Sequence, residues 1–560
     1  MSDVEKRIQS WLDGPFDAAT KEEIKRLQQT DPQALSDAFF KDLSFGTGGM
    51  RGYLGIGTNR MNSYTVRMAT QGLAQYINQF PGPHTVFIGY DTRHFSRQFA
   101  EDVAKVFSGN GIQALLSKEI CPTPLVSFAC RHFHCSAAVM ITASHNPAQY
   151  NGYKVYWSDG CQVTPPHDQG IMDEVGKIKS PSQVLLKESY TQIGEELDEA
   201  YLAELQKLQL LPELSAIPLK IAYTNLHGTG IRLVPKALKS WHYTDISIVP
   251  KQCTLDGSFP TAPSPNPEEE QALSLGSKML LDEKRDLLIA TDPDADRIGI
   301  VVLDQGKPVR LSGNQFACLC LHHICTVLTS QNAFPANAAF IKTIVTTELF
   351  RTIAQSFQAR CIDTLTGFKY IGAQIGIWEK AFDGYQYLFG AEESYGCLFG
   401  TFVRDKDAIS ASCLIAEVAA LAKRQNLTLV DRLHQIYQKY GLHRESLSSL
   451  AFDNTQAGME QMHSFMKKLR AHPPQQIHGQ QVTQLEDYLP GYQQLPPSDV
   501  LRFWLADHTK IVVRPSGTEP KIKIYIEIVE QNTQHLTAAI KQADARLKTL
   551  THEVLSVLGT

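Results

Sequence analysis

Apolar residues recur at helical spacing near the start of the chain. Ile8, Trp11 and Leu12 fall on one face of a helix, and Ile24 and Leu27 continue the pattern in the next segment. A spacing of three or four residues places apolar side chains on one side of an α-helix. We therefore expect about the first 40 residues to form amphipathic helices that cover the domain that follows.

Short apolar runs alternate with helical stretches from about residue 41 to residue 330, and a further cycle continues to about residue 440. Each run is about four to six residues long, the usual length of a buried strand. The clearest runs lie at residues 85–89, 137–141, 219–223 and 287–290. Strands that alternate with helices indicate βαβ units and mixed or parallel sheets. The pattern thus predicts three consecutive α/β cycles.

The character of the chain changes after residue 445. Residues 446–500 are polar and rich in Gln, His and Pro, and alternating strands are predicted at 500–506, 510–513 and 521–529. A terminal helix is predicted from about residue 533 to residue 557. Because adjacent strands joined by short turns pair antiparallel, we expect a C-terminal α+β module.

The composition is that of a globular protein. The chain has 560 residues, of which 43% are hydrophobic and 20% are charged, which excludes collagen-like and largely disordered classes. At roughly 150 residues per domain, the length predicts about four domains. With 53 Lys plus Arg against 58 Asp plus Glu, the net charge of -5 gives no support to a nucleic-acid partner.

The eleven cysteines are scattered, without a C-x-x-C pair or a zinc-site spacing, so we interpret them as reduced thiols that lie mostly in cores. The N-terminal segment lacks the apolar region of a signal peptide, and no stretch approaches about 18 uninterrupted apolar residues. We therefore expect a cytoplasmic protein with no membrane partner.

A first candidate site follows the strand at 137–141, where the chain reads Thr-Ala-Ser-His-Asn-Pro over residues 142–147. Ligands of open α/β sheets gather at the carboxyl ends of strands. Ser144 could therefore be a nucleophile, although the same string also forms helix caps and turns. A serine hydrolase is disfavoured because G-x-S-x-G is missing and His145, the chain neighbour of Ser144, is poorly placed as its base.

A second candidate site is the string Asp-Pro-Asp-Ala-Asp-Arg after the strand at 287–290. In an extended segment Asp292, Asp294 and Asp296 project to one side, where a cation relieves their repulsion. Three hard oxygen donors suit Mg²⁺. An EF-hand is excluded because Arg297 stands where its loop requires Gly. The alternative interpretation is a solvated acidic turn.

Two further loops carry weaker signals. The glycine-rich string at 390–396 could bind sugar hydroxyls through its two acids and its serine, or could form an exposed turn. The string Arg-Pro-Ser-Gly-Thr at 514–518 offers a guanidinium, two hydroxyls and exposed amides to a phosphate, or is a hairpin turn with an incidental Arg. No Walker A string is present, so nucleotide hydrolysis has little support.

In their order and separations, these four loops resemble those of the α-D-phosphohexomutase superfamily, and more closely its phosphoglucomutase/phosphopentomutase branch. Further matching motifs lie at residues 45–52, 89–93, 227–230, 367–371 and 403–407. The resemblance implies an α/β fold in which three α/β domains of shared topology, with mixed sheets, and a C-terminal α+β domain surround a central cleft. We place these domains at residues 1–205, 206–313, 314–445 and 446–560.

The resemblance also implies a mechanism. The serine that matches Ser144 is phosphorylated in the active family enzymes and donates its phosphoryl group to a sugar monophosphate. Mg²⁺ would lie between Ser144 and the carboxylates of Asp292, Asp294 and Asp296, because phosphoserine adds about -1.5 to -2 charge to an acidic site. The implied cofactors are Mg²⁺ and glucose 1,6-bisphosphate, which serves as activator and intermediate.

Other residues match family positions with known roles. Arg51 and Arg297 match arginines near the phosphoserine, and His145 would hydrogen-bond near it. Lys154 and Lys406 match lysines that act as general acid or base. A desolvated Lys beside Arg and Mg²⁺ can have a lowered pKa, which suits such a role.

The substrate-binding positions form another matched set. Glu392 and Ser394 match the residues that hold sugar hydroxyls. The residues that match the holders of the non-reacting phosphate are Arg514, Ser516, Gly517 and Thr518. Holding the remote phosphate lets binding energy orient the reacting hydroxyl.

The implied activity is that of a phosphoglucomutase, an isomerase that interconverts glucose 1-phosphate and glucose 6-phosphate. Phosphopentomutase, phosphomannomutase and glucose 1,6-bisphosphate synthase are the related alternatives, and Ala391 and Tyr395 depart from the pattern of other branches in a way that bears on hexose or pentose preference. A catalytically silent sugar-phosphate sensor is the alternative from another class. The intact Ser144 argues against a sensor, because binding alone needs no phosphoacceptor.

Overall fold

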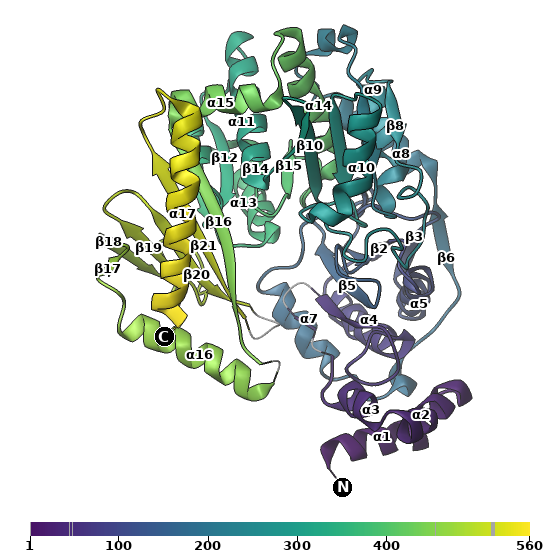
Figure 1. The fold of residues 1–560 in the computed structure, drawn as a ribbon. Helices are drawn as coiled ribbons and strands as arrows, with labels where there is room; N and C mark the ends of the chain where they lie inside the picture. Colours follow the sequence, from purple (N-terminus) through teal and green to yellow (C-terminus); the bar gives the residue numbers. More distant parts are fainter. Residues whose placement is uncertain (1, 44, 47–48, 454, 517–520, 560) are drawn as a thin grey trace. The chain divides into compact units, whose positions relative to one another are not determined.

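The computed structural model describes residues 2–43, 45–46, 49–453, 455–516 and 521–559. The chain divides into two compact units, each built from two stretches of sequence (Figure 1). The larger unit contains Met1–Phe316 and Phe368–Thr428, and the smaller unit contains Ala317–Gly367 and Leu429–Thr560.

The predicted N-terminal helices are confirmed. They are α1 (Asp3–Asp13), α2 (Ala18–Thr30) and α3 (Pro32–Phe39). Each begins at a polar cap, and Ser2 forms a reciprocal capping box with Glu5 at the start of α1. Trp11 and Phe39 pack edge to face, with ring centroids 5.3 Å apart, inside a small apolar cluster of the three helices.

The first sheet of the larger unit has six strands in the order β1-β5-β4-β2-β3-β6. Its strands are β1 (Gly49–Tyr53), β2 (Thr85–Tyr90), β3 (Gln113–Ser117), β4 (Ala137–Ile141), β5 (Tyr150–Trp157) and β6 (Tyr190–Ile193). Strands β4, β2, β3 and β6 are parallel, whereas β5 runs antiparallel to both β4 and β1. The associated helices are α4 (Ser63–Ile77), α5 (Ser96–Gly109), α6 (Thr123–His132), α7 (His167–Val175) and α8 (Glu195–Gln206). The sheet is therefore mixed, as predicted.

The second sheet has the order β11-β10-β9-β7-β8. Its strands are β7 (Ile221–Thr224), β8 (Ile246–Ile248), β9 (Leu287–Thr291), β10 (Ile298–Asp304) and β11 (Lys307–Leu311). Strand β7 is parallel to β8 and β9, and β9 turns back antiparallel into β10. The turn between β9 and β10 is the predicted aspartate loop. Helices α9 (Val234–Ser240) and α10 (Glu270–Asp282) belong to this part of the chain.

The remaining segment of the larger unit contributes a hairpin and two helices. Strand β14 (Gln386–Ala391) pairs antiparallel with β15 (Cys397–Phe399) and leads into the loop that contains Glu392. The helices are α13 (Phe368–Lys380) and α14 (Ala408–Arg424). Helix α14 is capped by the Asp407 side chain and is buried from Ala408 to Ala422, which explains its almost uninterrupted apolar and small residues.

The smaller unit combines a parallel strand pair with an antiparallel sheet. Strands β12 (Ala338–Thr343) and β13 (Arg360–Thr364) are parallel and flank α12 (Glu348–Ser356). The antiparallel sheet has the order β16-β21-β20-β19-β18-β17. Its strands are β16 (Leu442–Ala451), β17 (Gln476–Ile477), β18 (Gln480–Asp487), β19 (Leu501–Leu505), β20 (Lys510–Pro515) and β21 (Lys521–Glu530). The predicted α+β character of the C-terminal module is confirmed.

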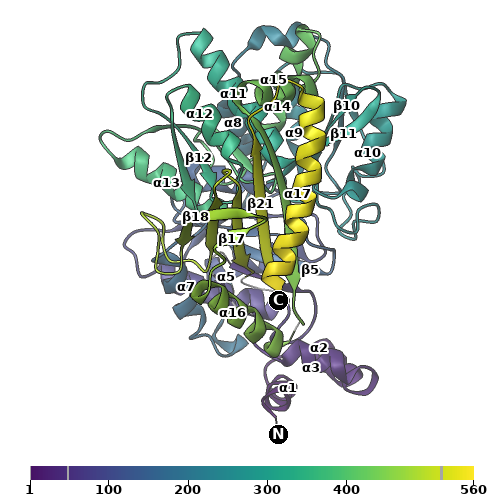
Figure 2. The same cartoon turned by 60° about the vertical axis from the view of Figure 1, so that its left-hand side comes forward.

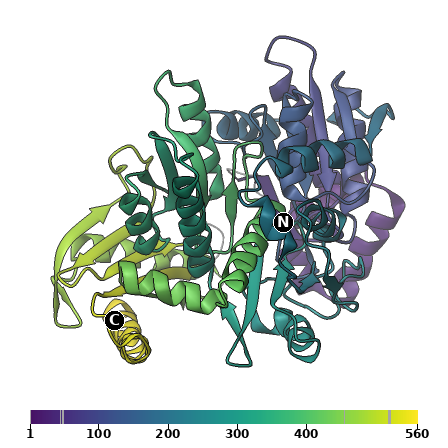
Figure 3. The same ribbon diagram turned by 90° about the horizontal axis from the view of Figure 1, so that it is seen from above.

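Helices complete the smaller unit. They are most of α11 (Gly313–Ser330), α15 (Leu429–Tyr440), α16 (Gln456–Ala471) and α17 (Leu536–Gly559). Helix α17 contacts β16 and β21. Figure 2 shows this yellow helix lying along the sheet, and Figure 3 views it almost end on. Among the described residues, no helix has the length and apolar character needed to cross a membrane.

Buried ion pairs join α12 to the antiparallel sheet within the smaller unit. Lys510 Nζ lies 3.0 Å from a Glu348 oxygen and 2.8 Å from a Glu527 oxygen. Lys342 Nζ approaches the same Glu348 at 2.8 Å and Asp363 at 3.0 Å. Burial would raise the pKa of Glu527, but the Lys510 charge outweighs it and lowers the pKa to about 2. Because these ammonium and carboxylate groups are buried away from water, the stability of each charge depends on its ion-pair partners.

We expect the substitution Lys510→Met to lower the free energy of unfolding by about 3–5 kcal/mol, because it removes the ammonium group that pairs with the buried carboxylates of Glu348 and Glu527. Urea unfolding followed by circular dichroism measures the change. The matched control is Lys541→Met on the exposed side of α17, which should stay within about 0.5 kcal/mol of the parent. Equal midpoints for the Lys510 variant and the parent would contradict the assigned role.

Candidate active site

The predicted nucleophile lies on the turn between β4 and β5. Ser144 is 4% exposed and adopts a left-handed backbone conformation, with φ at 53°. Its amide donates to Thr142 Oγ1 at 2.8 Å, and its hydroxyl donates to Asp292 Oδ2 at 2.8 Å. His145 Nδ1 lies 3.2 Å from the same hydroxyl. The turn thus presents the serine oxygen to the aspartate loop.

The three predicted carboxylates form one buried cluster. One oxygen each from Asp292, Asp294 and Asp296 lies within 4.8 Å of the others. Asp292 Oδ1 accepts hydrogen bonds from the amides of Asp296 at 3.1 Å and Arg297 at 3.0 Å, which closes the loop on itself. Ala295 takes a positive φ of 54° at the tip of the turn. The alternative of a solvated acidic turn is therefore wrong.

Two oxygens of this cluster have no hydrogen-bond donor. Asp294 Oδ1 and Asp296 Oδ1 are buried and without a hydrogen-bond partner in the described part of the chain. Burial and the two neighbouring carboxylates raise the pKa of Asp292 well above its ordinary value. A hard divalent cation would bind the carboxylate oxygens that have no donor, and it would also offset the repulsion among the three carboxylates. The donor set therefore fits an ion such as Mg²⁺.

Both predicted lysines contact the aspartates. Lys154 Nζ, on β5, lies 2.7 Å from Asp294 Oδ2 and 3.3 Å from Asp296 Oδ2. Lys406 Nζ lies 3.1 Å from Asp296 Oδ2 and 3.1 Å from Asp405 Oδ1. Burial alone would lower the pKa of each lysine, but the carboxylates outweigh burial and the pKa of each is raised. Acidic groups are the nearest charged neighbours of both lysines in this structure.

Residues that the sequence analysis did not select as site residues contact the aspartates and Lys406. Thr123 donates its hydroxyl to Asp294 Oδ2 at 2.7 Å, and Tyr156 donates to Asp405 Oδ2 at 2.8 Å. A Cβ at Gly396 would lie 2.2 Å from the Lys406 side chain, so glycine is required where that lysine passes. Thr123 starts helix α6 beside a proline and carries no recognisable chemical signal.

Backbone contacts from separate segments fix the aspartate loop. The Thr229 amide donates to Pro293 O at 2.8 Å, and a Cβ at Gly228 would lie 2.2 Å from Pro293 Cα. This close approach explains the His-Gly-Thr-Gly motif. The Ala408 amide donates to Ala295 O at 3.2 Å, which ties the loop to the start of α14.

The predicted arginines and histidine occupy the same neighbourhood. Arg51 is exposed and donates from Nη1 to Asn146 Oδ1 at 3.2 Å, beside the serine turn. Arg297 pairs with Glu268 at 3.0 Å. Burial, and then the charges of Arg297 and Arg51, lower the pKa of His145 well below its ordinary value. The imidazole is therefore neutral at pH 7.

The predicted sugar-binding residues also lie in the larger unit. Glu392 is 8% exposed, its amide donates to Gly396 O at 2.8 Å, and its charge helps to raise the pKa of Lys406. Ser394 is half-buried. The Ile298 amide donates to Tyr395 O at 3.0 Å, so this loop is tied to the strand that follows the aspartates.

The predicted phosphate loop belongs to the smaller unit. Arg514 lies at the end of β20, and the Ser516 amide donates to Lys521 O at 2.8 Å. Gly517 and Thr518 lie outside the described residues.

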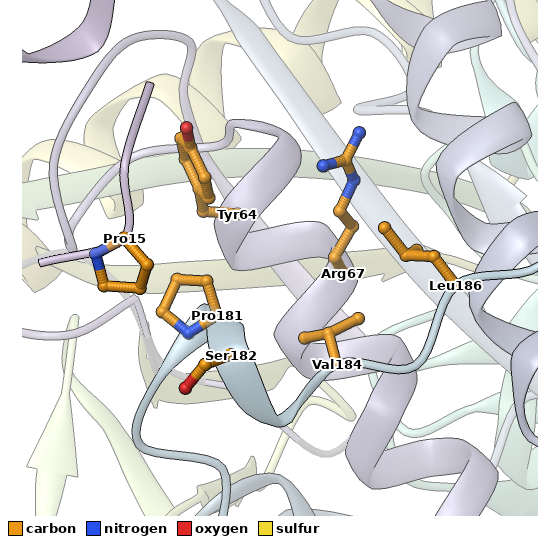
Figure 4. A pocket seen from close by; sticks show the side chains of 7 residues that line it. All are labelled: Pro15, Tyr64, Arg67, Pro181, Ser182, Val184 and Leu186. Atoms are coloured by element: carbon orange, nitrogen blue, oxygen red, sulfur yellow. The ribbon is translucent and has the colours of Figure 1, made fainter. Parts of the chain in front are cut away.

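A separate pocket lies near the N-terminal helices (Figure 4). Its lining residues are Pro15, Tyr64, Arg67, Pro181, Ser182, Val184 and Leu186. Arg67 is engaged there by Asp102, at 2.6 Å. The lining includes none of the predicted catalytic or metal-binding residues.

A buried serine beside carboxylates that can hold a divalent ion, carried on mixed α/β sheets, is the arrangement of a phosphohexomutase. Four domains described for phosphoglucomutase/phosphomannomutase match in order along the chain, with alpha/beta/alpha domains I, II and III and the C-terminal domain at residues 42–182, 199–306, 312–440 and 479–541. The chain belongs to this family of isomerase enzymes, and its predicted place in the α-D-phosphohexomutase superfamily is confirmed.

Curated relatives carry the same family name. A phosphoglucomutase from Staphylococcus haemolyticus (strain JCSC1435) is 34% identical over 521 residues, which is 90% of this chain and 93% of that protein. A phosphoglucomutase from Staphylococcus aureus (strain MRSA252) is 36% identical over 520 residues, with 90% and 92% covered.

Solved structures share the fold. Parafusin, a phosphoglucomutase from Paramecium in its open form, has a TM-score of 0.69 and 19% identity, with 91% of this chain and 95% of that chain covered. A family protein from Burkholderia thailandensis has a TM-score of 0.68 and 16% identity, with 92% and 97% covered. The predicted α/β class is thereby confirmed.

We expect Asp294→Asn to weaken Mg²⁺ binding by more than about 100-fold, because even changes outside the ligand shell cost roughly 10–100-fold. Isothermal titration calorimetry of the purified protein with Mg²⁺ measures the affinity. The exposed Asp282 at the end of α10 provides the control Asp282→Asn, which should bind like the parent. Equal affinity of the Asp294 variant and the parent would show that the ion binds elsewhere.

Proposed function

We propose that this protein is a Mg²⁺-dependent phosphoglucomutase that interconverts glucose 1-phosphate and glucose 6-phosphate through glucose 1,6-bisphosphate. The observation that carries the proposal is the hydrogen bond from Ser144 to Asp292, 2.8 Å long, beside two carboxylate oxygens that have no donor among the described residues. The names of the curated relatives support the same activity. The buried cysteine thiols are consistent with our proposal that the protein works in the reducing cytoplasm.

Ser144 is the proposed carrier of the phosphoryl group. In the first half-reaction its Oγ–P bond breaks and a sugar hydroxyl oxygen bonds to the phosphorus. In the second half-reaction the other phosphoryl group of the bisphosphate returns to Oγ. Asp292, Asp294 and Asp296 would hold Mg²⁺ with the phosphoryl oxygens of Ser144, and the bound ion would neutralise charge on the transferred group.

Lys154 and Lys406 are the proposed proton carriers. The attacking sugar hydroxyl loses a proton, and the departing Ser144 oxygen gains one, so each half-reaction needs an acid and a base. Both ammonium groups contact Asp296, at 3.3 and 3.1 Å, which supports a shared role beside the reacting atoms. Arg51 would clamp phosphoryl oxygens by charge-assisted hydrogen bonds.

Arg297 and His145 complete the proposed phosphoserine site. Arg297 would offer its guanidinium to the phosphoryl oxygens, and the neutral imidazole of His145 would hydrogen-bond to the serine oxygen that it already approaches at 3.2 Å. These two residues and Ser144 belong to loops that meet in the larger unit.

Substrate binding is assigned to two loops. Glu392 and Ser394 would hold sugar hydroxyls. The remote phosphate would be held by Arg514, Ser516, Gly517 and Thr518. Anchoring the phosphate that does not react turns binding energy into orientation of the hydroxyl that does.

Initial rates with several sugar phosphates test the substrate class. We expect glucose 1-phosphate to be turned over faster than ribose 1-phosphate or mannose 1-phosphate when glucose 1,6-bisphosphate and Mg²⁺ are present. Faster conversion of ribose 1-phosphate would instead identify a phosphopentomutase, and binding of all three without turnover would identify a sensor.

We expect intact-mass analysis to show a subpopulation heavier by one phosphoryl group, with peptide mapping to Ser144. Ser144→Ala should lose this species and reduce kcat by more than about 10⁴-fold, because loss of a nucleophile costs up to roughly 10⁶-fold. Ser274→Ala, at an exposed serine of α10, is the control and should retain both properties. An active Ser144 variant would overturn the proposed function.

A further inference from the structure

The guanidinium of Arg93 is buried beneath the serine turn. Arg93 lies in the Gly-Tyr-Asp-Thr-Arg motif that follows β2, and its side chain is fully buried. It donates hydrogen bonds to the carbonyls of Ser144 and Asn146, and to those of Pro147 at 2.8 Å and Tyr150 at 3.0 Å. The Arg93 side chain thus donates hydrogen bonds to four backbone carbonyls of the segment that contains Ser144.

Arg93 is itself held in one place. Its Nε lies 3.2 Å from Asp91 Oδ2, and the Asp91 side chain is also fully buried. The guanidinium carbon lies 4.9 Å from the centre of the Phe259 ring, which contributes a cation–π contact. A Cβ at Gly257 would come within 2.7 Å of the backbone at His94, so this segment packs tightly against the motif. These contacts hold the Arg93 side chain in one position next to the serine turn.

This anchoring bears directly on the geometry of Ser144. The serine has a φ of 53°, a region that non-glycine residues adopt only when their surroundings enforce it. The Arg93 guanidinium donates hydrogen bonds to the carbonyls of Ser144 and Asn146 in this turn, and so constrains its backbone. Without those donors, buried carbonyls would lose their hydrogen bonds and the turn would rearrange. The distance from Ser144 Oγ to Asp292, now 2.8 Å, depends on that arrangement.

We propose that Arg93 is a positioning residue for phosphoryl transfer, and that it acts by holding the Ser144 turn in its left-handed conformation. The inference rests on the proposed function of Ser144. Lysine is not an adequate substitute, because a single ammonium group lacks the planar fork that donates to several carbonyls at once. The sugar loop belongs to another segment, so substrate binding should survive the loss of Arg93.

Arg93→Lys tests this role through a separation of kinetic constants. We expect kcat to fall by about 100-fold, which is the cost of displacing a reacting atom by about 1 Å. KM for glucose 1-phosphate should stay within about twofold of the parent value. Arg97→Lys is the matched control, because the Arg97 side chain on α5 is exposed and pairs with Glu101 at 3.2 Å. It should leave kcat unchanged.

A parent-like kcat in folded Arg93→Lys would overturn the proposal, and so would a rise in KM as large as the fall in kcat, because that pattern indicates general damage to the site. If Arg93→Lys does not fold, Phe259→Leu removes the cation–π contact with the guanidinium, and it must lower kcat without changing KM. Ser144→Ala distinguishes the two claims. If the Ser144→Ala variant is active, the proposed function is wrong. If that variant is inactive but Arg93→Lys has the parent kcat, only the role of Arg93 is wrong.

Discussion

The close approach of three buried carboxylates is the constraint on which the rest of the site depends. Asp292, Asp294 and Asp296 repel one another in surroundings from which most water is excluded, so the arrangement needs positive charge nearby. Lys154 and Lys406 provide two charges, and the remaining carboxylate oxygens are left facing a position that suits a divalent ion. Phosphorylation of the neighbouring serine would add further negative charge and make the ion more necessary.

Such a cluster persists only because many parts of the chain hold it. The loop between β9 and β10 receives hydrogen bonds from Thr123, Thr229 and Ala408, which belong to three different regions of the larger unit. The serine turn comes from another sheet and is anchored by Arg93. A short motif could not maintain these positions alone. This explains why a fold of several α/β sheets accompanies chemistry that involves a handful of atoms.

The sequence predicted the elements whose pattern is distinctive and missed those whose pattern is weak. The apolar run at 137–141 is strand β4, whereas β16, β18 and α16 lie in a region that was recognised only as polar, because half-exposed strands there carry few apolar residues. The motifs identified the aspartate cluster and both lysines. They could not reveal that carboxylates raise the pKa of Lys406 or that Arg93 supports the serine, because both effects arise from contacts between distant segments.

The most direct test follows the phosphoryl group itself. Protein carrying an isotopically labelled phosphoryl group on Ser144 is mixed with glucose 6-phosphate and Mg²⁺ and quenched at intervals within a single turnover. The account predicts that the label leaves the serine and appears in glucose 1,6-bisphosphate at a rate at least equal to kcat. Label that remains on Ser144 while glucose 1-phosphate accumulates would contradict it.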